Sequence, residues 1–332
     1  MIGQETREVE RKAMAILKVL SGSQEPLGAR VIARRLGDFG IDLGERAVRY
    51  HLKLMDERGL TRSVGRRDGR SITQRGIEEV KSAMVGDRVG SIVGRIELLA
   101  YRTTFDLDKR IGEVPINTSL FPREGFAYAL EAMEGAFRAG LFVSELVAVA
   151  SEGERLGEVI VPQGKAGLAT VSSIVTSGAL FKAGIPVNSK FGGLLQVRNY
   201  DPFRFVELIE YSSCSLDPSE IFIASNMTSV IDAARRGEGK ILANFHEFPA
   251  VCRPVVETAI EKSKEAGLCG LVMMGEMSEP ICEVPVGLNK VGMILQSGLN
   301  PVAAAVEAGI EVENHAMSGL IDYRELRSFW DL

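Results

Sequence analysis

Three stretches in the first 85 residues place apolar side chains at helical spacing. The first ends at Gly22, the second lies between Gly28 and Gly37, and the third begins after Asp42. Steps of three and four residues bring these side chains onto one face of a helix. The apolar positions are Val9, Ala13, Ile16, Leu17 and Leu20, then Val31, Ile32 and Leu36, then Val48, Leu52 and Met55. The pattern therefore predicts three helices.

The third predicted helix, residues 45–58, has two distinct faces. Opposite its apolar side lies an arc of about 100°, wide enough to enter a DNA major groove. That arc carries Arg46, Arg49, Tyr50 and Lys53. Asp42 is expected to cap the helix, and Glu45 three residues later completes a capping-box-like start. Gly59 is expected to end it, because glycine readily adopts the left-handed conformation.

Two short alternating runs follow, residues 60–64 and 70–73, and Asp68-Gly69 between them is a strong hairpin-turn signal. Arginines lie at the tip of this predicted hairpin, where they can contact phosphates: Arg66, Arg67 and Arg70. Three helices followed by a β-hairpin form a winged helix. Residues 1–85 are therefore predicted to be a winged helix-turn-helix domain that binds DNA.

The distribution of charge supports DNA binding by this domain. Residues 1–85 carry 17 Lys and Arg against 12 Asp and Glu, a net charge of +5, whereas the rest of the chain carries 22 against 32, a net charge of −10. A basic head on an acidic body is expected when only the head meets a polyanion. The alternative is that the asymmetry is chance surface charge.

Residues 91–330 contain an internal repeat. Residues 116–122 parallel 243–249 at an offset of 127, and residues 183–187 parallel 308–312 at an offset of 125. Two related halves, about 91–215 and 216–330, are therefore predicted to pack about a pseudo-twofold axis.

Each half is expected to alternate short strands and helices in an α+β arrangement. The predicted helices are residues 123–139 and 250–266. The predicted strands include 146–150 and 271–274, with further strands around Ile185 and Leu194. Apolar runs at 92–100 and 221–225 are interpreted as the first strand of each half.

The body shows no sequence signature of an enzyme or a cofactor site. It has no P-loop, no dinucleotide-binding glycine motif, and no metalloprotease or serine-hydrolase motif. His246, Cys252, Cys282 and His315 match no known metal-ligand spacing, so neither a metal nor a cofactor is expected. Without a membrane-spanning apolar run or a CxxC pair, the chain is expected to be a cytoplasmic protein with reduced thiols.

The repeat also indicates where a small ligand would bind, because pockets commonly form where two halves meet. Asn117 and Asn244 occupy equivalent positions beside Ser119 and His246, and this polar cluster is suited to hydrogen bonds with a ligand. The alternative is that both asparagines only cap turns. Lys165, in the turn Gly164-Lys165-Ala166-Gly167, is a further candidate for binding an anion, although the same segment also fits an exposed turn.

The whole chain resembles the NrpR family, the nitrogen-regulation repressors of methanogenic archaea. In the head the matching segments are residues 33–36, 46–52 and 56–60. In the body, which carries the more specific part of the resemblance, they are residues 117–119, 184–187 and 192–194. Some members of the family carry two regulatory domains, whereas this chain has one.

The resemblance implies a repressor that binds palindromic operators of nitrogen-assimilation genes and is released by 2-oxoglutarate. A single head per chain then implies a homodimer or a higher homo-oligomer on each operator. A paralogue or a basal transcription factor is a further candidate partner. Because 2-oxoglutarate is a dicarboxylate, its site needs cationic or N–H donors. Lys165, Lys190 and Arg253 are therefore candidate contacts.

Two other functions remain compatible with the sequence. Winged helices also serve as protein-interaction modules, so one alternative is a scaffold whose head binds protein instead of DNA. The second alternative is an enzyme whose head guides a nucleic acid to a catalytic body.

Overall fold

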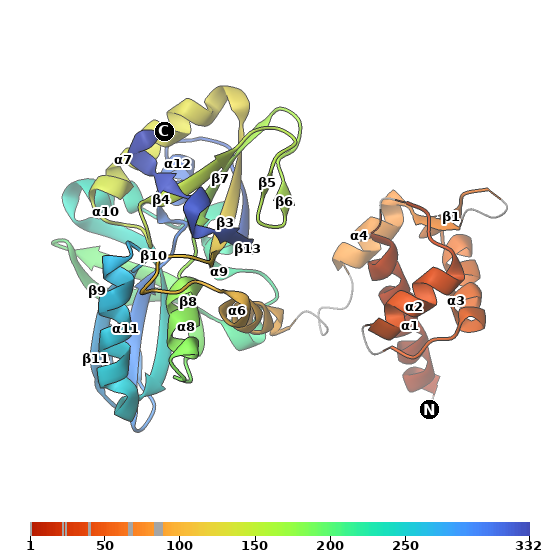
Figure 1. The fold of residues 1–332 in the computed structure, drawn as a ribbon, viewed down its shortest axis with the longest axis horizontal. Coiled ribbons are helices and arrows are strands. Elements are labelled where there is room, and N and C mark those ends of the chain that lie inside the picture. The colour runs from red at the N-terminus through yellow and green to blue at the C-terminus, as the bar shows by residue number, and fades with distance from the viewer. Residues whose placement is uncertain (1, 22, 24, 39–40, 66–68, 83–88) are drawn as a thin grey trace. The chain divides into compact units, whose positions relative to one another are not determined.

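The computed structural model describes residues 2–21, 23, 25–38, 41–65, 69–82 and 89–332 (Figure 1). Contacts divide the chain into two compact units, residues 1–88 and residues 89–332, which we call the head and the body.

The head is a winged helix. Its elements are α1 (Ile2–Ser21), α2 (Ala29–Asp38), α3 (Glu45–Glu57), β1 (Thr61–Ser63), β2 (Arg70–Ile72) and α4 (Gln74–Ser82). β1 and β2 form an antiparallel hairpin, and Leu27 adds a bridge to Arg70. The predicted apolar faces of the three helices supply most of the core, with Ile16, Ile32 and Val48 fully buried.

The two ends of α3 differ in how well the sequence predicted them. Gly59 has φ +71, so it ends the helix as expected. The predicted cap at Asp42 is wrong, because Gly44 is the N-cap residue and no side chain bonds the first turn.

The body contains two five-stranded antiparallel sheets. The first sheet has the order β13-β3-β7-β4-β14 and the second has the order β11-β12-β10-β8-β9. The first consists of β3 (Glu113–Pro122), β4 (Leu146–Ala150), β7 (Lys165–Val171), β13 (Glu313–Asp322) and β14 (Arg327–Ser328). The second consists of β8 (Asn188–Arg198), β9 (Asp201–Glu210), β10 (Glu238–Pro249), β11 (Leu271–Met277) and β12 (Lys290–Gln296). A small hairpin, β5 (Arg155–Leu156) and β6 (Val159–Ile160), completes the strands of the body.

Helices pack around these sheets. They are α6 (Ser91–Arg102), α7 (Phe126–Arg138), α8 (Ile174–Lys182), α9 (Pro218–Ala224), α10 (Val230–Arg236), α11 (Arg253–Glu265) and α12 (Asn300–Glu307). Short 3-10 turns lie at η1 (Arg123–Gly125), η2 (Tyr211–Ser213), η3 (Ala250–Cys252), η4 (Tyr323–Glu325) and η5 (Phe329–Asp331). The largest apolar core draws on both sheets and on α7, α10 and α12.

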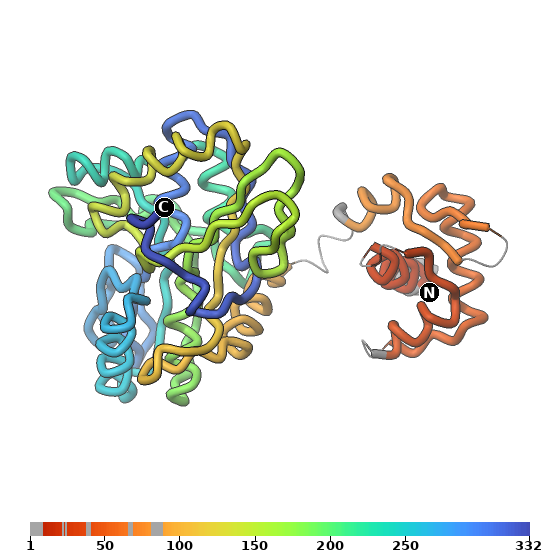
Figure 2. Tube along the Cα trace, turned by 45° about the horizontal axis from the view of Figure 1, so that its top comes forward, coloured from red at the N-terminus to blue at the C-terminus, as the bar shows by residue number. Residues whose placement is uncertain are grey.

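The two halves exchange strands. β8 is a late strand of the first half but pairs with β10 of the second half, whereas β13 is a late strand of the second half and pairs with β3 of the first. In Figure 2 the blue C-terminal segment accordingly runs beside the segments of the first half. Because the exchange is reciprocal, β3 and β10 are equivalent central strands, and each half is completed by the other.

Two predicted strands are helices. Residues 92–100 lie in α6 and residues 221–224 lie in α9. In α6 the buried residues Ile92, Ile96 and Leu99 are spaced by four and three, which is the helical pattern. In α9 the sequence Asp217-Pro218 provides a cap and a first-turn proline. Ile185 also lies outside any strand, whereas Leu194 lies in β8.

Candidate functional site

The exposed face of α3 carries the four residues that the sequence pattern placed there. Arg46, Arg49, Tyr50 and Lys53 are all exposed, while Val48, Leu52 and Met55 are buried on the opposite face. Arg49 forms an ion pair with Glu45 one turn earlier on the same helix. An exposed ion pair of this kind is weak, so a phosphate can replace Glu45 at little cost. The face is therefore basic and accessible.

The hairpin of β1 and β2, which we call the wing, is held against α3 by hydrogen bonds to Asp56. The Nε of Arg70 donates to Asp56 Oδ2 at 2.7 Å, and the hydroxyl of Thr61 donates to Asp56 Oδ1 at 2.6 Å. This ion pair gives Arg70 a structural role in placing the wing, which the sequence did not predict. Arg66 and Arg67 lie outside the described residues.

A polar cavity lies where the two halves of the body meet. We call it the central cavity, and its volume of about 30 Å³ is room for about one water molecule. Both halves line it at equivalent positions, namely Asn117 with Asn244 and Ser172 with Ser297. The remaining lining residues are Ile96, Ser173, Ile174, Tyr211, Asp217, Ser219, His246, Leu299, Ala316 and Met317. The repeat therefore brings Asn117, Asn244 and His246 together.

The two equivalent asparagines bond differently. Asn244 accepts a hydrogen bond from the Tyr211 hydroxyl at 2.7 Å and donates to Ser173 Oγ at 2.8 Å. Burial raises the pKa of Tyr211 well above its usual value, so its hydroxyl remains a donor. Asn117 accepts from the Met317 N–H at 3.0 Å, and its amide lies 3.5 Å from Thr170 Oγ1. Both are buried groups within the sheets, so neither only caps a turn.

His246 supplies the polar atom best suited to a ligand. Its side chain is buried, and its Nδ1 lies 3.0 Å from Ser189 Oγ. Its Nε2 has no hydrogen-bond partner in the part of the chain that the structure describes. Burial lowers the pKa of His246 to about 4, so the ring is neutral at physiological pH. Ser119 is the equivalent residue in the first half. Its hydroxyl donates to Asn314 Oδ1 at 2.7 Å, so, unlike Nε2 of His246, it has a hydrogen-bond partner.

Helix ends make the central cavity favourable for an anion. α8 begins at Ile174, which lines the cavity, and α12 begins one residue after Leu299, which also lines it. The N-terminus of a helix carries a partial positive charge, although the first N–H groups of these two helices already donate to Ser172, Ser173 and Ser297. Asp217 opposes this effect, although its carboxylate is partly satisfied because it accepts from the Ser219 N–H at 2.8 Å.

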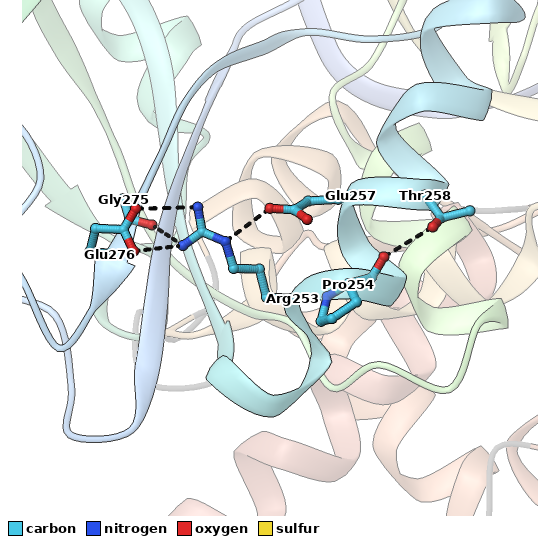
Figure 3. A network of polar contacts seen from close by, with 6 residues as sticks. All are labelled: Arg253, Pro254, Glu257, Thr258, Gly275 and Glu276. Carbon is cyan, nitrogen blue, oxygen red and sulfur yellow. Dashed lines mark hydrogen bonds and ion pairs between the residues drawn. The ribbon is translucent and has the colours of Figure 1, made fainter.

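The cations expected from the sequence are not part of this cavity. Lys190 donates to Glu247 at 3.2 Å, and Lys165 begins β7 opposite Pro122. Arg253 is held at the start of α11 by Glu257, by Glu276 and by the carbonyl of Gly275 (Figure 3). None of the three is among the described residues that line the central cavity. Lys190 is thus paired with a buried carboxylate, and Arg253 with two exposed ones.

Sequence reasoning missed the serines and Tyr211. Ser172 and Ser297 are separated by 125 residues, the same offset as the later part of the repeat, so this pair was detectable. Tyr211 and Asp217 come from a segment without a counterpart in the repeat, and only the folded chain brings them to the cavity.

Two further expectations concern metals and membranes. Within the described ranges, no group of three or more His, Cys, Asp and Glu is placed to hold a metal ion. Among the same residues, no helix is both long enough and apolar enough to cross a bilayer.

Comparisons with known protein families give one match for the body and one for the head. A family model described as NrpR regulatory domains NRD1 and 2 matches residues 89–328, and one described as the ribonuclease R winged-helix domain matches residues 14–80. The global nitrogen regulator NrpRI of Methanosarcina mazei is 40% identical over 320 residues, which cover 96% of this chain and 98% of that protein.

Two longer relatives and one solved structure are also similar to this chain. The global nitrogen regulators NrpR of Methanococcus maripaludis and Methanocaldococcus jannaschii are 32% and 34% identical over 92% and 96% of this chain, which spans only 53% and 55% of their lengths. The crystal structure of a nitrogen repressor-like protein from Methanococcus jannaschii has a TM-score of 0.61 at 23% identity, over 72% of this chain and 98% of that one. At that identity the likeness concerns the fold alone.

Proposed function

Because the chain belongs to the NrpR family of nitrogen regulators, we propose that it represses nitrogen-assimilation genes by binding operator DNA and is released by a small effector. The observation that carries this proposal is the exposed basic face of α3 in a winged helix joined to an NrpR regulatory body. The relatives are named as regulators, which argues against the alternative of an enzyme.

In the proposed complex, α3 lies in the major groove. Arg46, Arg49, Tyr50 and Lys53 contact phosphates and base edges, and Arg66 and Arg67 of the wing contact phosphates. Arg70 holds the wing in position through Asp56. Two copies of the chain are needed to place two heads on a palindromic operator, so the functional state is a homodimer or a higher homo-oligomer.

The proposed effector is 2-oxoglutarate, and the proposed site is centred on the central cavity. The support is chemical, since a carboxylate suits the free Nε2 of His246, the amides of Asn117 and Asn244, and the N-termini of α8 and α12. Weakening DNA binding by about 100-fold requires about 2.7 kcal/mol of coupling between the two sites.

Binding of the full chain to its own upstream DNA, measured by mobility shift with and without millimolar 2-oxoglutarate, tests this function. A specific complex that 2-oxoglutarate dissociates is the expected result. A complex that ignores the dicarboxylate would leave a regulator with a different effector. If no salt-dependent complex forms, the head binds protein, and the scaffold alternative replaces the repressor.

Substitutions on α3 test the groove assignment. Arg46→Ala and Arg49→Ala are each expected to weaken operator binding by about 10-fold or more. Arg58→Ala is the matched control, because Arg58 is also exposed but follows the end of α3 and pairs with Glu79. Arg67→Ala is expected to weaken binding to all sequences alike and to lower the salt slope by about one. Equal effects of Arg46→Ala and Arg58→Ala would place the DNA elsewhere.

A further inference from the structure

The central cavity is too small for the proposed effector. A volume of about 30 Å³ holds about one water molecule, and a five-carbon dicarboxylate needs several times as much. A ligand of that size must therefore extend into neighbouring space or enlarge the cavity. The inference below rests on the proposed function, because it concerns how the same site is reached and filled.

A second cavity lies next to the first, between α6 and α8. We call it the outer cavity, and its volume is about 370 Å³. It is lined by Val93, Ile96, Glu97, Ala100, Tyr101, Ser177, Phe181, Pro186, Val187, Asn188 and Ser189. Space of this size accommodates a small metabolite.

Two residues connect the two cavities. Ile96 of α6 lines both of them, so its side chain forms part of the wall that separates them. Ser189 lines the outer cavity, and its hydroxyl lies 3.0 Å from Nδ1 of His246, which lines the central cavity. The two cavities are therefore neighbours, separated by residues that they share or that contact each other.

The outer cavity also contains an unsatisfied polar group. Ser177 of α8 is 4% exposed, and its Oγ has no hydrogen-bond partner among the described residues. A buried hydroxyl without a partner costs free energy, and a ligand or an ordered water would remove that cost. Ser177 of the outer cavity and His246 of the central cavity thus each carry one buried polar atom that has no partner among the described residues.

The attachment of α6 allows the wall to move. Between its ends the helix contributes Ile92, Ile96, Leu99 and Ala100 to an apolar cluster with Ile174, Tyr211 and Met317. Its ends are fixed, because the Gly90 N–H donates to the Cys214 carbonyl at 3.1 Å and the Thr103 hydroxyl donates to the Glu113 carbonyl at 2.6 Å. Apolar contacts are not directional, so the middle of α6 can shift without breaking these hydrogen bonds.

We propose that the outer cavity is the entrance and the outer half of the effector site, and that Ile96 is the gate between it and the central cavity. A carboxylate-bearing ligand enters between α6 and α8, displaces Ile96, and places one carboxylate against His246 and the asparagines. The rest of the ligand remains in the outer cavity near Ser177.

The first test of the gate needs no effector. Diethyl pyrocarbonate modifies neutral imidazole, and mass spectrometry of the full chain resolves the modification of His246 from that of His51 and His315. Ile96→Ala is expected to accelerate modification of His246 by about tenfold, since shortening the side chain opens the wall. Ile92→Ala is the matched control, because Ile92 is buried on the same helix one turn earlier and lines neither cavity.

Equal rates for wild type and Ile96→Ala would overturn the gate. An equal acceleration by Ile92→Ala would also overturn it, because general loosening of α6 would then explain the access. Modification of His315, which is partly exposed, serves as the internal standard in each sample.

The second test uses 2-oxoglutarate and stopped-flow mixing. Ile96→Ala is expected to raise the association rate about tenfold and Ile92→Ala to leave it unchanged. Ser177→Ala is expected to weaken affinity severalfold while leaving thermal stability equal or higher, because it removes an unsatisfied hydroxyl. Glu97→Gln is expected to tighten affinity, because the one carboxylate lining the outer cavity repels a dicarboxylate.

The failures of the gate and of the proposed function are distinguishable. If wild type does not bind 2-oxoglutarate but Ile96→Ala still exposes His246, the effector assignment fails and the gate stands. If 2-oxoglutarate binds wild type and Ile96→Ala at the same rate, the effector assignment stands and the gate is overturned.

Discussion

Two of the helices that border the central cavity, α6 and α9, are held in place by different forces. α9 is fixed by a directional polar contact to β13, since its Glu220 accepts from the Ala316 N–H at 2.6 Å. α6, in contrast, is held along its length by apolar packing. Burial raises the pKa values of Asp217 and Glu220, and the positive charge of Arg95 on α6 offsets this rise in part.

This difference indicates which side of the cavity opens. Breaking a buried hydrogen bond leaves a donor or an acceptor unsatisfied, whereas sliding an apolar surface does not. α9 is therefore the fixed border and α6 the movable one. The movable border, α6, is also the first helix of the body after the head in sequence.

The largest expected effect concerns the two equivalent asparagines of the central cavity. Asn244→Ala should lower the free energy of unfolding by about 3 kcal/mol, because it leaves both the Tyr211 hydroxyl and Ser173 without their partner. Asn117→Ala should cost only about 1 kcal/mol, since it removes one good hydrogen bond, from the Met317 N–H. Urea unfolding of the full chain measures both losses. Equal losses would mean that the two asparagines contribute alike to stability.

A smaller effect is expected where α6 meets α8. A Cβ at Gly178 would lie 2.4 Å from Cγ2 of Thr103 and 3.2 Å from the carbonyl of Ala100. Gly178→Ala should therefore destabilise the body by about 2 kcal/mol and should speed hydrogen exchange in α6 more than in α9. Gly135→Ala in α7 is the control, because that Cβ would meet nothing within 4 Å and should stabilise the helix by up to about 1 kcal/mol. Uniform exchange in both helices would contradict a movable α6.

The fixed border should also respond to pH. Burial raises the pKa of Glu220 to about 7, above the ordinary value of 4.5 that it regains on unfolding. As the pH rises from about 5 to about 7.5, the unfolded chain loses this proton first, so folding becomes less favourable by about 1–2 kcal/mol. Glu220→Gln should remove this dependence, as measured by unfolding at both pH values. His246 is present in both proteins, so its own titration cancels in the difference. The same pH dependence in both proteins would show that Glu220 is not the responsible group.

The smallest effect is expected from the surface of α6. Arg102 pairs with Glu158 at 3.6 Å, and both side chains are about half exposed or more, at 49% and 65%. Arg102→Gln should change the free energy of unfolding by less than about 0.5 kcal/mol. A loss several times larger would mean that an ion pair pins α6, and the distinction between the two borders would weaken.

Much of the fold was predictable because it follows from local periodicity. The buried faces of α1, α2 and α3 and the Asp-Gly hairpin signal predicted the winged helix, and the repeat predicted the related halves. α6 and α9 were misread because their apolar runs are short. In both cases the deciding signal was present, as the spacing of Ile92, Ile96 and Leu99 and as the pair Asp217-Pro218.

In the candidate site, only residues at repeated positions of the sequence were predictable. Asn117, Asn244 and His246 were identified because equivalent positions near an axis converge. Lys190 and Arg253 do not line the central cavity, and the sequence could not show this, because a cation looks the same in sequence whether it faces a ligand or a carboxylate such as Glu247 or Glu276.

The sequence by itself determined the winged head, its basic helix face and the duplicated body, since each is encoded in residues close together or in a repeated order. Only the tertiary structure decided that the halves exchange β8 and β13, that Tyr211 and Asp217 close one side of the central cavity, and that Ile96 separates it from the outer one. The physical reason is that these features depend on contacts between distant segments. Such contacts are selected by the packing of the whole body, and no local pattern records them.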